Sequence, residues 1–360
     1  MAARWAGRAA AALAILAVVA LVATATGRYL LRAAWEEGMI LRRRRPIAAV
    51  IASPGVDART RGKLQLVLAA RAFAADSVRL RAGESFTTFS PLAHDTLVLV
   101  LSGAYRDRLK QYSWWFPIVG RVPYKGFFDF AAAKQAARDL DRRGFDVYLR
   151  PSPAFSTLGF FNDPLLSTSL REDSLDLANT VIHELTHNTF YAPGQAVFNE
   201  SFANFVGARG AAWFFRSRGD ARAAAEEDAR WRDDRVLGAF YTAVYRALDT
   251  AFKQRPGDDD ASRTARLRAR DSIYAAARRL LVDSVAPALH GPLPPRWATR
   301  VRLDNAAVLA RRIYLTDLQL FDAVLEREGG DLRRTIDRIV ALAKSRPKDP
   351  YGAIREWLAR

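Results

Sequence analysis

The feature that most constrains this chain is the segment from His183 to His187, which reads His-Glu-Leu-Thr-His. Residues four positions apart on a helix lie on the same face, so the two imidazole groups can converge on one cation while Glu184 projects beside them. The chain has only 4 histidines in 360 residues, which makes chance a weak explanation. The segment predicts a zinc site with an adjacent general base, and the alternative is two histidines packed on a core helix.

This geometry requires a helix, and the flanking sequence predicts one. Asp173-Ser174 is typical of a helix cap, and Pro193-Gly194 ends the run. Apolar residues recur between them at helical spacing, at Leu177, Val181, Ile182 and Leu185. We therefore expect both histidines on one face of a helix.

Glu200 is the predicted third ligand, because a catalytic zinc ion normally takes three protein ligands and leaves the fourth position to water. It lies in a second helical pattern over residues 199–206, after a turn at residues 192–195. Two helices joined by such a turn can place Glu200 opposite the histidines. A glutamate near a helix start could instead serve only the helix dipole. Asn204, one turn later, is either a hydrogen-bond partner of a ligating imidazole or a solvated helix residue.

The string Asn-Glu-Ser-Phe-Ala at residues 199–203 resembles the segment that carries the third ligand in the gluzincin metallopeptidases, whose zinc is held by two histidines and one glutamate. The separation from the histidines is shorter here than in the best-known gluzincins. Most of the chain after about residue 40 resembles the bacterial putative (predicted) aminopeptidase family, which has this compact spacing. The resemblance covers residues 115–128, residues 154–164 and both zinc segments, and more weakly residues 304–307 and 329–332.

The resemblance implies zinc-dependent peptide hydrolysis, and the residue types suggest how it proceeds. Zinc lowers the pKa of its bound water toward ~7 and polarises the scissile carbonyl, while Glu184 takes the water's proton and returns it to the leaving amine. The tetrahedral oxygen then needs a donor in addition to zinc. Tyr124, Tyr191 and Tyr314 lie near the motif-like segments. Tyr314 is the preferred donor, and a buried structural tyrosine is the alternative for each of the three.

Substrate contacts are predicted in a segment that reads as a short strand before the zinc helix. The residues are Ser156, Thr157, Leu158 and Gly159. An exposed strand there could pair with a peptide main chain, and the alternative is an ordinary sheet strand. An aminopeptidase also needs a carboxylate for the free amine of its substrate, for which Asp163 and Asp304 are conceivable. Neither is marked by its spacing, so the exopeptidase assignment rests on the resemblance.

The N-terminus predicts a membrane segment. After Arg4 and Arg8, residues 9–26 form a near-continuous apolar run that is long enough for a marginal span. Ala23-Thr24-Ala25 would also serve as a cleavage site after a signal peptide. We favour an uncleaved anchor, because the run is longer than a usual signal core. A cleaved and secreted form is the alternative.

Two arguments about the side of the membrane conflict. More positive charge follows the run than precedes it, at Arg28, Arg32 and residues 42–45, and the positive-inside rule then favours a cytoplasmic domain. The resemblance implies export, because most relatives carry secretory starts and large domains translocate largely regardless of charge. We expect the catalytic domain to be extracytoplasmic, on the periplasmic side.

Length and composition set further bounds. A chain of 360 residues with 50% hydrophobic content can bury a substantial core in one large domain or two intimate ones. The absence of cysteine excludes disulfides, a thiol nucleophile and cysteine-ligated zinc. The net charge of +17, carried mostly by arginine, is expected to attract anionic lipid or acidic polymers. No nucleic-acid fold signature accompanies it, so we expect no nucleic-acid partner.

We predict an α+β, gluzincin-like fold with a small mixed sheet, a largely helical C-terminal half and an N-terminal membrane helix. Helices are expected at residues 56–78 and 131–143, strands at 95–102 and 145–150, and helix nearly throughout from about residue 222. The predicted parts are an anchor or signal at 1–27, a juxtamembrane arm at 28–55 and a zinc metallopeptidase domain at 56–360. The expected function is peptide hydrolysis as an aminopeptidase. The alternative is a membrane-tethered peptide-binding or scaffolding protein with a structural or vestigial zinc site.

Overall fold

The computed structural model describes residue 5 and residues 22–92, 98–116, 120–152, 164–291 and 293–360, and helices make up most of it. The helices are α2 (Ala25–Arg43), α3 (Ile47–Ala52), α4 (Ala58–Phe73), α5 (Phe130–Arg142), α6 (Ser174–Thr189), α7 (Ala196–Ser217), α8 (Ala221–Lys253), α9 (Asp260–Leu280), α10 (Trp297–Arg300), α11 (Asn305–Leu315), α12 (Leu318–Arg327), α13 (Leu332–Ser345) and α14 (Pro350–Ala359). The C-terminal half is helical, as the sequence predicted.

The strands are short and belong to small sheets. They are β1 (Arg45–Pro46), β2 (Thr88–Ser90), β3 (Val98–Tyr105), β4 (Trp114–Phe116), β5 (Gly120–Val122), β6 (Tyr124–Phe127), β7 (Phe145–Ser152) and β8 (Leu165–Leu166). Sheet β6-β3-β7 is antiparallel, β1-β2-β8 is mixed, and β4 and β5 form a two-stranded pair. The predicted small mixed sheet is present as β1-β2-β8, and further small sheets accompany it among the described residues. The shortest of these strands were not predicted, because strands of two or three residues carry no readable periodicity.

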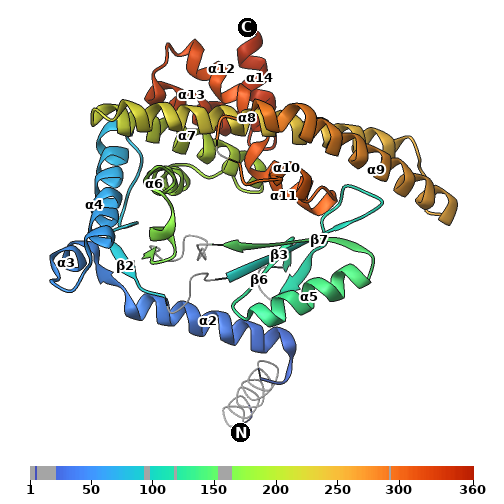
Figure 1. Cartoon of the computed structure of the whole chain (residues 1–360), viewed down its shortest axis with the longest axis horizontal. Helices are drawn as coiled ribbons and strands as arrows, with labels where there is room; N and C mark the ends of the chain where they lie inside the picture. The colour runs from blue at the N-terminus through green and yellow to red at the C-terminus, as the bar shows by residue number, and fades with distance from the viewer. Residues whose placement is uncertain (1–4, 6–21, 93–97, 117–119, 153–163, 292) are drawn as a thin grey trace.

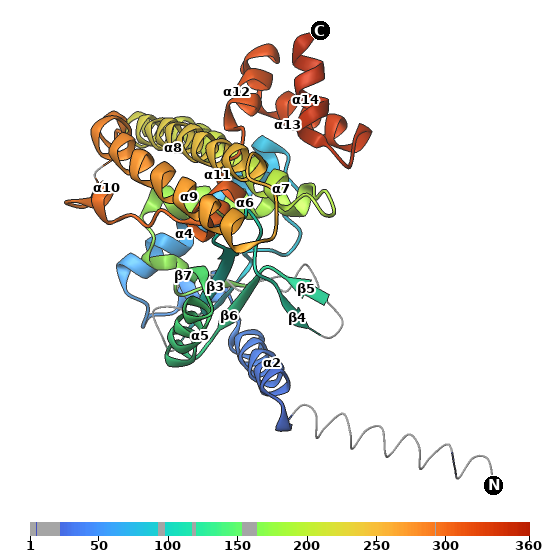
Figure 2. The same ribbon diagram turned by 90° about the vertical axis from the view of Figure 1, so that its right-hand side faces the viewer.

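Figure 1 shows the antiparallel sheet between α2 on one side and the layer formed by α6, α7, α8 and α9 on the other. Turned by 90°, the same arrangement keeps α2 at one end of the molecule and α12, α13 and α14 at the other (Figure 2). Helix α5 packs beside the sheet, and α11 packs against both the sheet and helices α7 and α8. The sheet is therefore joined to the helical layer through α11.

The main core lies within the helical layer and is rich in aromatic side chains. Phe198, Phe202 and Phe205 project from α7 at helical spacing and are fully buried. Phe321 of α12 meets all three, with ring centroids 5.6 to 6.0 Å apart. Removing one such ring typically costs about 3–5 kcal/mol of folding free energy, so this cluster fixes the position of α7.

A buried ion pair fastens the antiparallel sheet to the helices. Asp146 of β7 accepts hydrogen bonds from Arg270 of α9 at 2.7 and 2.8 Å and from the backbone amide of Asn305 at 3.0 Å. The Asn305 side chain in turn donates to the carbonyl of Tyr105 at 2.8 Å. Burial raises the pKa of Asp146, although the Arg270 charge opposes that rise. Arg106 also lies 3.2 Å from this carboxylate. The position of β7 relative to α9 and α11 therefore depends on a buried carboxylate that Arg270 and the Asn305 amide help to satisfy.

The segment at residues 28–55 contributes structure of its own. Helix α2 spans most of its first half, and Ile47 and Val50 of α3 belong to the main core. This part of the predicted juxtamembrane arm thus packs with the domain that we expected to begin at residue 56. Residues 6–21 of the N-terminal segment, including most of the predicted span, lie outside the described residues. Within the described residues, no helix combines the length and apolarity needed to cross a bilayer.

Candidate metal centre

Helix α6 presents the two histidines, and its cap is the one that the sequence predicted. The Asp173 carboxylate accepts hydrogen bonds from the amides of Leu175 and Asp176 at 2.9 and 2.8 Å, which stabilises the first turn. The residues at 177, 181, 182 and 185 are fully buried. Because this apolar stripe fixes the rotation of α6, the neighbouring face with His183 and His187 is held at the edge of the core.

The turn between α6 and α7 is closed by Asn199. Its side-chain oxygen accepts from the amide of Ala192 and its side-chain nitrogen donates to the carbonyl of Ala192, both at 2.9 Å. Gly194 adopts a φ of 76°, which a residue with a side chain rarely does. Helix α7 begins at Ala196, three residues before the start of the predicted pattern. The reversal places Glu200 back beside α6.

Two glycines of α7 let this helix approach α6 closely. A β-carbon at Gly207 would lie 2.5 Å from the side-chain oxygen of Asn179 and 3.2 Å from the Cβ of His183. One at Gly210 would lie 2.8 Å from Ile182. Real contacts of this kind are not that short, so the helix pair depends on the missing side chains. The close crossing brings the start of α7 within reach of the histidines.

The three predicted ligands converge. The Nε2 atoms of His183 and His187 lie 3.2 Å apart, and the carboxylate oxygens of Glu200 lie 3.4 Å from the first and 3.5 Å from the second. Among the described residues, these three form the group that could hold a metal ion. Ligand atoms bound tetrahedrally at about 2.0–2.1 Å lie about 3.3 Å from one another. Both the donor types and their separations therefore fit zinc.

The charges and hydrogen bonds of the cluster keep the Glu200 carboxylate ionised at neutral pH. Burial would raise the pKa of Glu200, but hydrogen bonds from His183 and His187 lower it to about 2. The pKa of His187 is raised overall. Burial alone would lower it, but the hydrogen bond and the negative charge of Glu200 outweigh the effect of burial. An anionic oxygen between two imidazole nitrogens is a ready-made cation site.

Glu184 remains outside this group. Its side chain is exposed, and it is not among the residues whose ligand atoms converge. Its charge nevertheless raises the pKa of His187 and of Tyr314, which places it close to the cluster. A carboxylate that borders a metal site without binding the metal can accept a proton.

Tyr314 of α11 is the predicted donor that is most enclosed near the cluster. Burial raises the pKa of its hydroxyl, and the charges of Glu200 and Glu184 raise it further. The pKa of Tyr124 is also raised, first by burial and then by Tyr191 and Glu200. Tyr314 and Tyr124 thus lie near the Glu200 carboxylate, and Tyr191 lies near Tyr124. Tyr124 and Tyr191 are exposed.

The family described as "Putative aminopeptidase" matches residues 28–350. The chain belongs to this putative aminopeptidase family. Comparison with curated proteins finds no match, and comparison with solved structures finds none either.

The segments that resembled the putative aminopeptidase family have identifiable structural roles. Asp304 caps α11 by accepting from the amide of Ala307 at 2.8 Å, and it pairs with Arg302. Asp331 caps α13, following two glycines with positive φ at residues 329 and 330. Both carboxylate oxygens of Asp304 therefore have partners within the protein, which does not favour Asp304 as the group that binds a substrate amine. Asp163 and the predicted contact residues 156–159 lie outside the described residues.

Asn204 makes contacts that differ from those expected of a partner to an imidazole. Its side-chain nitrogen donates to the carboxylate of Asp234 at 3.2 Å and lies 3.5 Å from the carbonyl of Tyr314. Burial raises the pKa of Asp234 to about 6, against the lowering effects of Asn204 and Arg311. Asn204 therefore links α7 to α8 and to the end of α11, one turn below Glu200.

Two other residues near the cluster were not predicted from the sequence. The Arg150 guanidinium at the end of β7 lowers the pKa of Tyr314, opposing the effect of burial. Ser201 donates to the carbonyl of Ile313 at 3.1 Å and accepts from the amide of Thr316 at 3.2 Å. Ser201 directly follows Glu200, so its hydroxyl joins the backbone beside this candidate ligand to the helix turn that carries Tyr314. Both contacts bridge residues more than 100 positions apart, which local patterns cannot reveal.

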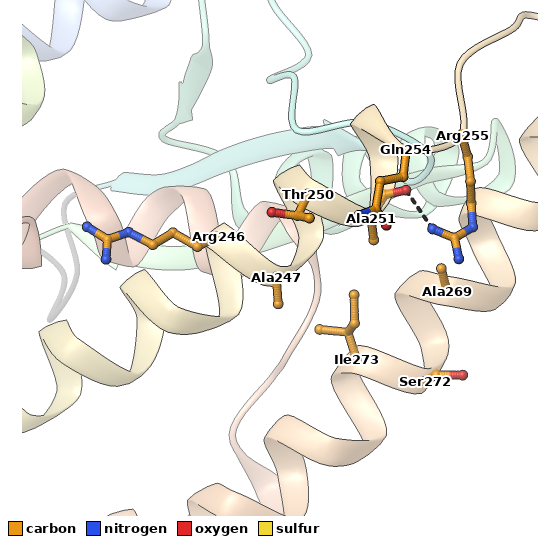
Figure 3. A pocket seen from close by; sticks show the side chains of 9 residues that line it. All are labelled: Arg246, Ala247, Thr250, Ala251, Gln254, Arg255, Ala269, Ser272 and Ile273. Atoms are coloured by element: carbon orange, nitrogen blue, oxygen red, sulfur yellow. Dashed lines mark hydrogen bonds between the residues drawn. The ribbon is translucent and has the colours of Figure 1, made fainter.

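A surface hollow of about 590 Å³ lies between α8 and α9, apart from the histidines (Figure 3). It is lined by Arg246, Ala247, Thr250, Ala251, Gln254, Arg255, Ala269, Ser272 and Ile273. Figure 3 shows Arg246 and Arg255 at opposite ends, and Arg255 donates to the carbonyl of Ala251 at 2.9 Å. This lining contains no carboxylate or imidazole, so it offers neither a metal ligand nor a general base at neutral pH.

Proposed function

We propose that the protein is a gluzincin-type zinc metallopeptidase that acts as an aminopeptidase. The observation that carries the proposal is the convergence of His183, His187 and Glu200 at tetrahedral spacing, with Glu184 beside them and outside the ligand group. Membership of the putative aminopeptidase family supports peptide as the substrate. When bound, zinc would supply a Lewis acid that polarises the scissile carbonyl and acidifies water.

Two residues near the cluster are proposed to transfer the proton and to stabilise the transition state. Glu184 takes a proton from the attacking water and returns it to the leaving amine, because it is a carboxylate that is not needed as a ligand. The hydroxyl of Tyr314 donates to the oxygen that gains negative charge in the transition state. Its elevated pKa keeps this hydroxyl protonated at neutral pH. Residues 156–159 are proposed to pair with the peptide main chain.

The proposed arrangement in the cell follows from the N-terminal sequence. Residues 1–27 anchor the chain in the membrane or serve as its signal, and residues 56–360 form the catalytic domain. We place this domain on the periplasmic side. Protease added to intact cells with a permeabilised outer membrane should then digest it, and protection until the inner membrane is opened would place it in the cytoplasm.

Turnover tests the proposed chemistry. Purified full-length protein should contain about one zinc ion per chain and cleave aminoacyl fluorogenic substrates. The variant His187→Ala should lose both the zinc ion and the cleavage activity. Glu184→Gln should keep the zinc and lose at least about 100-fold in kcat. Glu326→Gln, an exposed glutamate on α12, is the matched control and should behave like the wild type.

Each alternative has its own result. Zinc without cleavage of any peptide in a broad library would favour a binding or scaffolding protein with a structural zinc site. Cleavage that persists in Glu184→Gln would remove Glu184 as the base. Cleavage of N-terminally blocked peptides at undiminished rates would make the enzyme an endopeptidase.

A further inference from the structure

Helix α2 has two faces of different character. On its inner face, Tyr29 packs against Phe116 and Phe127, with ring centroids 5.6 and 6.4 Å away, and Lys125 lies 4.6 Å from the Tyr29 ring centre. Ile40 is buried, and its carbonyl accepts a hydrogen bond from the Ser90 hydroxyl at 2.9 Å. The helix is therefore fastened to the antiparallel sheet and to β2.

The outer face combines exposed apolar side chains with arginine. Trp35 is 65% exposed and Leu31 is 44% exposed, and Arg28, Arg32 and Arg42 are exposed beside them. These five residues, which we call the α2 stripe, are spaced by one, three or seven positions and fall on one side of the helix. Leu31 and Trp35 are neighbours on this face, and an exposed apolar patch rimmed by charged residues marks an interaction site.

Charge and position in the chain indicate what covers the α2 stripe. Residues 22–46 contain six arginines and two glutamates, and one of these glutamates, Glu36, already pairs with Arg32 at 2.6 Å. The stripe also follows directly after the apolar run at residues 9–26. Figures 1 and 2 show α2 at the edge of the molecule opposite the C-terminal helices.

We infer that the α2 stripe lies on the surface of a membrane containing anionic phospholipid, with Trp35 and Leu31 in the headgroup region and the arginines beside phosphate groups. Interfacial helices have this composition, with basic residues flanking a tryptophan or leucine face. Tryptophan prefers the headgroup level, and arginine can bury its aliphatic stem while its charge contacts phosphate. Because α2 is fastened to the sheet, such contact would hold the whole catalytic domain in one orientation to the bilayer.

Single-cysteine labelling of the full chain tests this inference, since the chain contains no native cysteine. Trp35→Cys carries an environment-sensitive fluorophore, and vesicles contain phosphatidylcholine with or without phosphatidylglycerol. We expect a blue shift and quenching by nitroxide-labelled lipid in the anionic vesicles. Ala34→Cys is the matched control, because Ala34 is exposed and adjacent to Trp35 but does not belong to the α2 stripe. Leu280→Cys places the label on α9, away from the α2 stripe.

The outcomes separate the possible causes. Equal quenching at positions 34 and 35 would mean that the apolar run merely tethers the helix near lipid, and would overturn the inference. So would a label at position 35 that remains aqueous, or a blue shift without vesicles that grows with protein concentration, which indicates a second copy. Arg28→Gln/Arg42→Gln should weaken quenching severalfold, whereas Arg263→Gln/Arg268→Gln, the same charge change on α9, should alter it less than twofold. If the two double variants reduced the quenching equally, the proposed contact between the α2 arginines and lipid phosphate would be wrong.

Discussion

Gly207 of α7 faces Asn179 of α6 so closely that a β-carbon at position 207 would lie 2.5 Å from the asparagine side-chain oxygen. The same carbon would crowd the Cβ of His183 at 3.2 Å. The distance between the two helices, and with it the distance from Glu200 to the histidines, is therefore set at a residue that binds nothing. This relationship makes the candidate metal site sensitive to packing about two helix turns from Glu200.

Gly207→Ala should weaken zinc binding by about 10–100-fold, as loss of support around a metal site typically does, and destabilise the fold by about 1–3 kcal/mol through overpacking. Zinc competition titration and urea unfolding measure the two effects. Gly62→Ala on α4, where a β-carbon meets nothing within 4 Å, should bind zinc normally and gain up to about 1 kcal/mol. Unchanged zinc affinity in Gly207→Ala would show that the helix contact does not position Glu200.

Tyr314→Phe should lower kcat by about 10²–10³-fold and leave KM and zinc content nearly unchanged, because the lost hydrogen bond acts on charge that develops only in the transition state. Steady-state kinetics on one aminoacyl substrate provides the comparison. Tyr124→Phe and Tyr191→Phe serve as controls and should each cost less than tenfold. If either control shows the larger loss in kcat, that tyrosine is the donor instead.

Glu227 should make the protein less stable as the pH rises through neutrality. It is buried in α8, its Oε2 accepts from Asn179 at 3.3 Å, and its Oε1 has no partner among the described residues. Burial raises its pKa from 4.5 to about 7. The folded state therefore keeps a proton that the unfolded chain has lost, so stability falls from about pH 4.5 and levels off above pH 7.

Glu227→Gln should remove this pH dependence. The variant should exceed the wild type in unfolding free energy at pH 8 by up to about 3 kcal/mol, the equivalent of the raised pKa, and match it near pH 4.5. Urea unfolding at both pH values measures the difference. Glu226→Gln, its exposed neighbour, should show no such divergence. A constant difference between Glu227→Gln and wild type at the two pH values would mean that this carboxyl titrates normally.

Asp146→Ala should destabilise the fold by about 3–5 kcal/mol, because it leaves the buried Arg270 guanidinium without its main partner. Asp271→Ala removes the other carboxylate on Arg270, which lies 2.9 Å away and is largely exposed, and should cost less than about 1 kcal/mol. Thermal or urea unfolding compares the two. Similar costs for both variants would show that the sheet is not anchored through Asp146.

Local patterns predicted the parts of the site that are adjacent in sequence. The cap at Asp173, the apolar stripe of α6 and the return of Glu200 after a short turn all depend on neighbours within one or two helix turns, and the structure has each of them. The start of α7 was predicted three residues late because Ala196 and its neighbours lie ahead of the recognisable motif. Strands β1, β2 and β8 were not predicted, because their pairing depends on residues far apart in the chain.

The remaining surroundings of the site were beyond a single sequence for the same reason. Arg150 reaches Tyr314 from β7, and Glu227 reaches Asn179 from α8. Each is an ordinary charged residue in its own segment, and only the folded chain shows what it touches. Helix α2 illustrates the opposite case, in which part of the predicted juxtamembrane arm is a packed helix.

The bridge from Ser201 to the end of α11 makes the spacing between Glu200 and Tyr314 independent of the chain that connects them. The connection includes the long α8–α9 hairpin, whose exposed turn at residues 256–260 lies far along the sequence from both ends of the bridge. Added residues in that turn need not move either side chain. The hairpin turn is therefore a natural position at which to insert a reporter domain while Glu200 and Tyr314 keep their relative geometry.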